Sequence, residues 1–213
     1  MTDCQGLFVV FESASKCGKT TLVHLLAEGL SSKYPNQEVI THHGALSESE
    51  FAQKVKAANI EDLGYSTAFY WSDIIFHTID TIRPALQDGK FIIHDRYDLS
   101  IVAWREIHGY SNDMILQDEY LNRGFLINPD LTVYLDPQID VVLERIRQSD
   151  SSLMDLTFLK YPERFTQMQD SIQKHLLRLN RNHILINTSK DAPEACQVII
   201  LDVIQSILRE RSK

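Results

Sequence analysis

Residues 9–21 read VVFESASKCGKTT, an apolar run that leads directly into Gly18-Lys19-Thr20. A strand that enters a turn and then a helix is the setting of a phosphate-binding loop, because backbone N–H groups and the helix N-terminus converge there on an anion. In such a loop Lys19 reaches the β- and γ-phosphates of a nucleotide, and the Thr20 hydroxyl ligates Mg²⁺. The strict pattern GxxxxGK[ST] has glycine where this chain has Ser13, and serine there costs on the order of 1 kcal/mol if a positive φ is required.

Short apolar runs rich in β-branched and aromatic residues alternate along the chain with segments of helical period. Each run has the pattern of a strand that is buried on both faces of a parallel sheet. The predicted strands are 7–11, 38–41, 91–94, 131–135 and 183–187. The predicted helices are 20–32, 48–58, 66–87, 99–108, 139–148, 162–180 and 193–210, with a break near Arg83 because Pro84 follows. This alternation predicts an α/β fold in which a five-stranded parallel sheet carries helices on both faces.

Composition and charge narrow the function classes. No internal repeat and no linker rich in Gly, Ser or Pro interrupts the 213 residues, so one domain spanning residues 1–213 is expected. Lys plus Arg (21) and Asp plus Glu (29) give a net charge of −8, which argues against nucleic acid or an anionic membrane as partner. The chain has no run of 18 apolar residues, and its first residues lack the basic segment of a secretory signal. A cytoplasmic location is therefore expected.

A second candidate motif, Asp95-Arg96-Tyr97, follows the apolar run FIIH. Ligands of open α/β sheets bind at the carboxyl ends of the strands, where this motif is expected to lie. An acid there can orient an attacking oxygen or hold the water shell of a metal ion, and an arginine beside it can bind a phosphoryl group. On its own the motif is equally compatible with a structural ion pair. Together with the phosphate loop it predicts a site of phosphoryl transfer.

Three blocks of the chain resemble the thymidylate kinase family of nucleoside monophosphate kinases. Residues 11–21, FESASKCGKTT, resemble the family's FEG…GK[ST]T loop. Residues 82–100, IRPALQDGKFIIHDRYDLS, resemble its IxPALxxGxxVxxDRYxxS segment, and this block is the most specific. Residues 131–147, LTVYLDPQIDVVLERIR, resemble its LTxxLDxxPExxxxRxR segment.

The resemblance implies a three-layer P-loop NTPase fold, a lid near residues 148–160, and transfer of the γ-phosphoryl group of ATP to dTMP with Mg²⁺. It implies that Lys19, Asp95, Arg96 and Lys16 serve the transfer centre, and that Thr20 and Asp95 serve the metal. The implied ATP-binding residues are Ser13, Ala14, Ser15, Lys16, Cys17, Gly18, Lys19, Thr20, Thr21 and Arg145. The implied acceptor-binding residues are Glu12, His43, Tyr70, Ile74, Arg96, Ser100 and Arg105. The relatives also imply a homodimer, with helix 66–87 in the interface.

Several acceptor-reading positions depart from the family pattern. The family commonly has an arginine for the acceptor phosphate after the second strand, where residues 41–44 read THHG. The family stacks the base on a phenylalanine and reads it with an arginine four residues later, and here these positions are Tyr70 and Ile74. Tyrosine can still stack, but isoleucine cannot donate a hydrogen bond. Arg105 aligns with a polar position, often glutamine, that lies near the base in the relatives, and it is a candidate to supply the donors instead.

The loop and lid depart as well. Family members place a catalytic arginine in one or the other, but residues 148–159 contain no Lys or Arg. Lys16 stands at the loop position of that arginine and keeps its charge without its two-pronged geometry. Ser15 stands where the family usually has aspartate.

Two alternatives remain open at this stage. One is a kinase of a nucleoside or another small hydroxyl acceptor, in which Asp95 or Glu12 would accept the hydroxyl proton. The other is a non-catalytic nucleotide-binding protein, in which Ser13, Ser15 and the lid without arginine record lost catalysis. All three hypotheses include a bound nucleotide. In the two kinase hypotheses this nucleotide is the phosphoryl donor, and a small-molecule acceptor binds as well.

Overall fold

The computed structural model describes residues 6–43, 63–110, 112–149 and 152–211. Five strands form one sheet in the order β2-β3-β1-β4-β5, and every neighbouring pair is parallel. The strands are β1 (Leu7–Glu12), β2 (Val39–His43), β3 (Phe91–Asp95), β4 (Leu131–Leu135) and β5 (His183–Ile186). The predicted five-stranded parallel sheet is confirmed, with small shifts at the strand ends.

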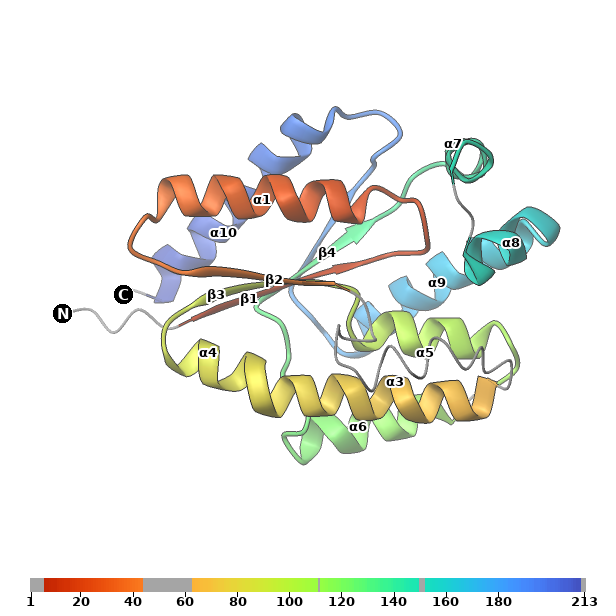
Figure 1. Cartoon of the computed structure of the whole chain (residues 1–213), viewed down its shortest axis with the longest axis horizontal. Helices are drawn as coiled ribbons and strands as arrows, with labels where there is room; N and C mark the ends of the chain where they lie inside the picture. Colours follow the sequence, from red (N-terminus) through yellow and green to blue (C-terminus); the bar gives the residue numbers. More distant parts are fainter. Residues whose placement is uncertain (1–5, 44–62, 111, 150–151, 212–213) are drawn as a thin grey trace.

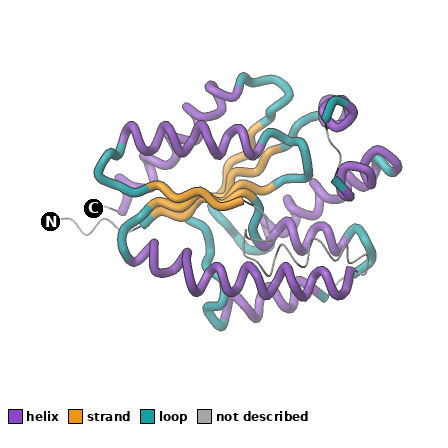
Figure 2. The backbone as a smooth tube through the Cα atoms, viewed as in Figure 1, coloured by secondary structure: helices purple, strands orange, loops and turns teal. Residues whose placement is uncertain are grey.

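Helices connect the strands and cover both faces of the sheet (Figure 1). They are α1 (Lys19–Lys33), α3 (Leu63–His77), the π-helical turn η1 (Thr78–Ile82), α4 (Arg83–Gln87), α5 (Asp98–Glu106), α6 (Asp113–Asn122), α7 (Ile139–Arg147), α8 (Leu153–Lys160), α9 (Glu163–Arg178) and α10 (Pro193–Arg211). Helices α1 and α10 lie on one side of the sheet, and α3, α4 and α5 lie on the other. Figure 2 shows the strands as a thin central layer between these helices.

Strand β1 explains why the core has two halves. Its residues are buried without exception, and successive side chains of a strand point to opposite faces. Leu7, Val9 and Phe11 belong to a buried cluster that includes residues of α1 and α10. Phe8 and Val10 belong to a second cluster, with residues of α3 and η1. A strand that is apolar at every position from Leu7 to Phe11 therefore fits only the middle of a sheet covered on both sides.

The strand order places the candidate site. Strand β1 lies between β3 and β4, and the register pairs Phe11 with Asp95 and Glu12 with Tyr134. The phosphate loop therefore leaves the sheet beside the Asp95-Arg96 motif. In Figure 1 this edge of the sheet, the start of α1, and helices α7 and α8 all lie at the right, opposite the two termini.

The long helix predicted over residues 66–87 is interrupted. Helix α3 ends at His77, η1 adopts the wider π-helical turn, and Pro84 lies in the first turn of α4. Proline has no N–H and its ring clashes with the preceding turn, so the helix cannot pass through it unchanged. The break expected near Arg83 is confirmed, and it takes the form of a π-turn directly before that residue.

Two helices were not predicted, and one predicted helix lies outside the described residues. Helix α6 buries the polar residues Asp113 and Gln117, so its sequence shows no apolar stripe of helical period. Helix α8 begins with a capping box between Ser152 and Asp155, inside the segment expected to be a lid. The helix expected over 48–58 falls in the part of the chain that is not described.

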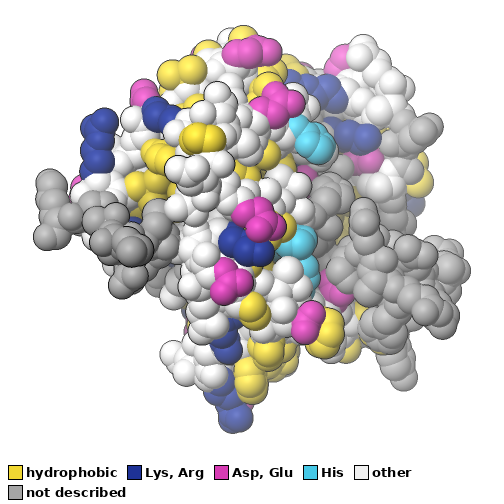
Figure 3. Space-filling model, turned by 60° about the vertical axis from the view of Figure 1, so that its left-hand side comes forward, with side chains coloured by type: hydrophobic (Ala, Val, Ile, Leu, Met, Phe, Trp, Pro, Cys, Tyr) yellow, Lys and Arg dark blue, Asp and Glu magenta, His cyan; other side chains and the backbone are white. Residues whose placement is uncertain are grey.

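No helix in the described ranges has the length and apolar character needed to cross a lipid bilayer. On the face shown in Figure 3, Lys and Arg side chains are interspersed with Asp and Glu. That pattern agrees with the net charge of −8 and gives no continuous basic surface on this face.

Candidate active site

The loop between β1 and α1 has the backbone of an anion-binding nest. Gly18 (φ 95°) and Lys16 (φ 57°) are left-handed, and alternation of this kind turns successive N–H groups toward one side. Ser13 is not among the described residues with positive φ. Serine at this position therefore carries no backbone strain, and the departure from the strict glycine pattern leaves the loop intact.

Lys19 lies buried under the loop. Its Nζ donates to the carbonyl of Ala14 at 2.6 Å and to Oγ of Ser13 at 3.0 Å. Burial, and next the nearby Arg96 guanidinium, lower the pKa of Lys19 from 10.5 to about 8. Below that pKa the side chain is a cation held at the base of the phosphate loop, as the sequence predicts.

Thr20 and Asp95 bring two hard oxygen ligands together. The hydroxyl of Thr20, in the first turn of α1, donates to Oδ2 of Asp95, at the end of β3, over 3.0 Å. Adjacent ligands of an octahedral Mg²⁺ with bonds of about 2.1 Å are separated by about the same distance. The pair therefore fits the Mg²⁺ site expected from the sequence. In the described part of the chain no group of three or more His, Cys, Asp and Glu side chains forms a metal site.

Arg96 crosses from β3 to the phosphate loop. Its Nη1 donates to the carbonyl of Ser13 at 2.9 Å, and its backbone N–H donates to the carbonyl of Phe11 at 2.9 Å. Arg96 has a φ of 70°, which is unusual for a residue with a side chain and indicates a conformation imposed by its surroundings.

These residues open onto one cavity of about 730 Å³. It is lined by Ser15, Lys16, Cys17, Gly18, Lys19, Thr20, Thr21, Leu22, Asp95, Arg96, Arg145, Ser149, Ser152, Asp155, Thr188, Asp191, Pro193 and Cys196. The loop, the Thr20–Asp95 pair and Arg96 thus converge on the same space.

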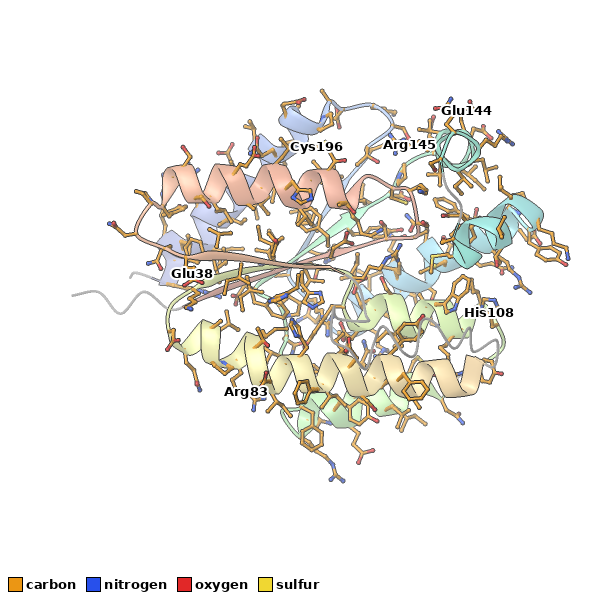
Figure 4. All side chains as sticks on the ribbon, in the orientation of Figure 1. Glu38, Arg83, His108, Glu144, Arg145 and Cys196 are labelled. Atoms are coloured by element: carbon orange, nitrogen blue, oxygen red, sulfur yellow. The ribbon has the colours of Figure 1, made fainter. Side chains whose placement is uncertain are left out.

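Arg145 closes one side of this cavity. It donates from Nη1 to the carbonyl of Lys16 at 3.2 Å and from Nη2 to the carbonyl of Thr188 at 2.9 Å. Figure 4 shows Arg145 of α7 near the turn that precedes α10. The neighbouring Arg147 pairs with Glu144 at the surface, so the two arginines face different ways as expected from their spacing.

The wall of the cavity that comes from the segment expected to be a lid is polar and acidic. Ser152 caps α8 by accepting from the N–H of Asp155, whose Oδ2 accepts from the N–H of Ser152 at 2.8 Å. Asp155 is 1% exposed and lines the cavity. In the described part of the wall, this segment therefore contributes serine and aspartate, and its sequence contains no arginine.

The predicted acceptor residues are only partly brought together. Tyr70 is half-buried on α3; burial raises its pKa, and the nearby charge of Arg96 opposes that rise. Arg105 pairs with Asp113 at 2.9 Å and lies 3.8 Å above the ring of Tyr110. Ile74 is 1% exposed and packs in the core under α3, so this position does not present its side chain to an acceptor.

Glu12 and His43, two further predicted acceptor residues, are the last residues of β1 and β2. Glu12 is fully buried, and its Oε1 accepts from the N–H groups of Tyr97 (3.0 Å) and Leu99 (3.2 Å), while Oε2 accepts from Ser100. Both carboxylate oxygens thus hold the start of α5, and Ser100 is engaged by Glu12. The backbone of His43 ends β2 opposite Asp95, and its side chain lies outside what the structure describes.

Two supporting residues were missed by the sequence analysis. Gln169, from α9, accepts from the N–H of Ala14 at 2.9 Å and donates to the carbonyl of Leu135 at 2.8 Å. Thr188, after β5, donates to the carbonyl of Cys17 at 2.8 Å. Only the place of Thr188 at the carboxyl end of a strand gave a signal, and nothing in the sequence around Gln169 marked it.

Gly18 provides a test of the loop conformation. A Cβ at Gly18 would meet the side chain of Thr188 at 3.8 Å or more, so Gly18→Ala is opposed by φ and not by space. The left-handed conformation costs a residue with a side chain about 1–2 kcal/mol. We therefore expect about tenfold weaker ATP binding in calorimetry.

Gly109→Ala is the control: its φ is +86°, its Cβ would meet no atom within 4 Å, and it is not among the residues that line the cavity. Equal loss of ATP binding in both variants would contradict the role of the loop.

Comparisons with known proteins agree with this geometry. A family model described as thymidylate kinase matches residues 11–199. The thymidylate kinase of Staphylococcus epidermidis is 26% identical over 202 residues, which cover 91% of this chain and 97% of that protein. The thymidylate kinase of Staphylococcus haemolyticus is 30% identical over 165 residues, which cover 74% of this chain and 78% of that protein. The crystal structure of thymidylate kinase from Ehrlichia chaffeensis matches with a TM-score of 0.71 at 20% identity, covering 93% of this chain and 98% of that one, and shows the same fold.

Proposed function

Because this chain belongs to the thymidylate kinase family of phosphotransferases, we propose that it transfers the γ-phosphoryl group of ATP to dTMP and so forms dTDP. The observation that carries the proposal is the convergence of the phosphate loop, the Thr20–Asp95 pair and Arg96 on one cavity. Each of the three is a part that phosphoryl transfer between nucleotides requires.

Charged side chains and backbone dipoles would bind the donor nucleotide. The loop amides and Lys19 would hold the β- and γ-phosphates, and Arg145, together with the turn at Thr188, would border the nucleoside. Lys16 replaces the loop arginine of the relatives. It would contribute a positive charge but not the two parallel hydrogen bonds that an arginine can donate to a phosphate. Thr20 and Asp95 would hold Mg²⁺, which when bound supplies neutralisation of the phosphate charge.

The transfer itself needs little proton chemistry. An oxygen of the acceptor phosphate is already ionised near neutral pH, so no strong base has to remove a proton from it. Arg96, fixed against Ser13, would stabilise charge on the group in transit, and Asp95 would orient the ligands around it.

Acceptor reading is the part in which this chain differs from the family pattern. Ile74 lies in the core, so the arginine of the relatives has no substitute at that position. We propose that Tyr70 stacks on the base and that Arg105, held by Asp113, supplies donors to it. Ser100 and Glu12 then contribute by shaping the wall at the start of α5.

A coupled assay of ADP release, run with a panel of nucleoside monophosphates and nucleosides, tests the proposed function. Turnover is expected with dTMP and absent with thymidine, because both candidate bases are already engaged: Glu12 accepts three hydrogen bonds, and Asp95 accepts from Thr20 in the proposed Mg²⁺ site. Turnover of nucleosides alone would establish the hydroxyl-kinase alternative. ATP binding in calorimetry without turnover of any acceptor would establish the non-catalytic alternative.

We also propose that the protein is a cytoplasmic homodimer. The described cysteines, Cys17 and Cys196, are free thiols, which suits a reducing compartment. For the dimer, Phe76 on α3 and Ile79 on η1 are 67% and 43% exposed, and large apolar side chains exposed together mark interaction surfaces.

A charge introduced at Phe76 tests the dimer. In sedimentation equilibrium, Phe76→Glu is expected to shift the protein from dimer to monomer at micromolar concentration, because a carboxylate would be desolvated in an apolar interface. Val198→Glu is the control, since Val198 is 56% exposed on α10, on the opposite side of the sheet. A monomeric wild-type protein at these concentrations would refute the dimer.

A further inference from the structure

A buried ion pair lies directly behind the transfer centre, outside the residues that line the donor cavity. Asp98, at the start of α5, and Arg181, after the end of α9, have side chains 0% and 2% exposed. Two hydrogen bonds of 2.7 and 2.6 Å join both carboxylate oxygens to the guanidinium. Gln117 of α6 donates to the same carboxylate at 2.7 Å, and Asn128 accepts from Arg181 at 3.2 Å. Gln117 and Arg181 therefore hold the first residue of α5, and Asn128 holds Arg181.

The residue next but one to Asp98 is Arg96, and its backbone is strained. A φ of 70° costs a residue with a side chain free energy that its surroundings must offset. On the loop side Arg96 is held by Phe11 and Ser13. On the helix side the backbone passes through Tyr97, whose hydroxyl is 2.9 Å from Oγ1 of Thr78, into the Asp98–Arg181 pair.

Stability alone does not account for such a pair. Taking two charges out of water costs about as much as their attraction returns, so an apolar pair of similar volume would stabilise the fold as well or better. What an ion pair with two parallel hydrogen bonds adds is a defined direction and distance. In this protein the pair fixes the backbone at Asp98, which is two residues from Arg96, the arginine of the transfer centre.

We propose that Asp98 and Arg181 are positioning residues, which keep Arg96 in its left-handed conformation so that its guanidinium faces the donor cavity. This proposal rests on the proposed function for its kinetic readout, but not for its structural one. Neither residue contacts the cavity, so both act through Arg96.

A double-mutant cycle with Arg96 tests the proposal. Asp98→Asn is expected to lower kcat with dTMP about tenfold and to leave KM for ATP within about twofold, because misplacement of a catalytic group mainly affects the transition state. The variant Asp98→Leu/Arg181→Met, which replaces the ion pair by apolar side chains, should fold and show the same loss of kcat. In an Arg96→Ala background neither change should lower kcat further, since the group that they position is absent. Independent, additive losses would overturn the proposal.

Two controls separate positioning from a loss of stability. Lys174→Met removes a 2.6 Å ion pair with Glu106 that joins α9 to the other end of α5. Ile204→Val thins the buried core on α10. Both should keep kcat near the wild-type value, even if the melting temperature falls as far as in Asp98→Asn. A matching loss of kcat in either control would show that stability alone explains the effect.

Hydrogen exchange of the Arg96 amide gives a readout that does not require turnover. This N–H donates to Phe11 at 2.9 Å, and its protection should fall at least tenfold in Asp98→Asn and remain in Lys174→Met. If the wild-type protein phosphorylates no acceptor, the proposed function fails while this exchange measurement still decides the positioning role. Wild-type protection of Arg96 in both Asp98 variants would overturn the proposal.

Discussion

Lys19→Met is expected to lower kcat by about 10³-fold, the largest loss among the single changes considered, because it removes the buried cation that we propose neutralises the β- and γ-phosphates. Methionine has a similar length and fills the same space without a charge. Since burial lowers the pKa of Lys19 to about 8, the folded protein is penalised for holding this cation at neutral pH. Removal of the charge should therefore not lower the melting temperature by more than a few degrees, despite the loss of the contacts with Ser13 and Ala14.

Steady-state kinetics and differential scanning calorimetry on the same samples check this expectation. Lys33→Met, at the exposed end of α1, is the control and should retain wild-type turnover. Activity within tenfold of wild type in a folded Lys19→Met protein would show that the cavity at the phosphate loop is not the donor site.

The second large effect is a loss of stability in acid, caused by three histidines packed together under the sheet. His42 of β2, His77 of α3 and His94 of β3 have ring centroids 4.1 to 5.9 Å apart. Burial, and then the neighbouring His77, lower the pKa of His42 to about 4; burial, and then His77 and His42, lower that of His94 to about 3. Burial also lowers the pKa of His77, against the opposing charges of Asp73 and Asp80.

The sign follows from proton binding. Unfolded histidines bind protons as the pH falls through about 6.5, whereas folded His42 and His94 stay neutral to near pH 4, so the stability of the fold decreases throughout that interval. Glu12 acts in the opposite sense, because burial and the charge of Asp98 raise its pKa to about 7 and the folded state gains a proton first. His42 and His94 together outweigh this one carboxyl group, and the lowered pKa of His77 acts in the same direction as theirs, so the net result should be a loss of several kcal/mol between pH 6.5 and 4.

Urea unfolding at a series of pH values measures this loss. His94→Phe should flatten the acid limb, since it removes the most deeply buried of the three rings and keeps an aromatic side chain beside Phe8 and Tyr97. His24→Phe, on the exposed surface of α1, should leave the acid limb unchanged. An acid limb of equal slope in wild type and His94→Phe would exclude the cluster as its cause.

The parts of the structure that the sequence predicted are those that depend on short, contiguous sequence patterns. Polar residues directly follow two apolar runs: the loop through Lys19 follows the strand from Leu7, and Asp95 follows FIIH. The carboxyl ends of parallel strands lie at the same edge of the sheet, so these polar residues meet there. The supports of the site come from long-range contacts that leave no local pattern. Gln169 contacts Ala14 across more than half of the chain, and its sequence neighbourhood is that of an ordinary amphipathic helix.

The assignment of acceptor residues shows where family resemblance ended. A position can align with a reading residue and still point elsewhere: Ile74 joins the core because an apolar side chain on that face of α3 is stabilised by burial. Glu12 ends β1, where a candidate base is expected, yet the buried N–H groups of Tyr97 and Leu99 at the start of α5 donate to its carboxylate. Such choices depend on which partners the fold supplies, and the sequence alone does not list them.

The central strand also sets the order in which the protein can mature during synthesis. Leu7 pairs with Phe91 and Val9 pairs with Leu131, so β1 gains both of its neighbours only after β4 has been translated. Until then one edge of β1 has no strand to pair with, and contacts of such long sequence separation form slowly. The nascent N-terminal third is therefore expected to depend on chaperones that bind apolar segments, and ribosome-bound chains arrested before residue 131 should remain sensitive to protease.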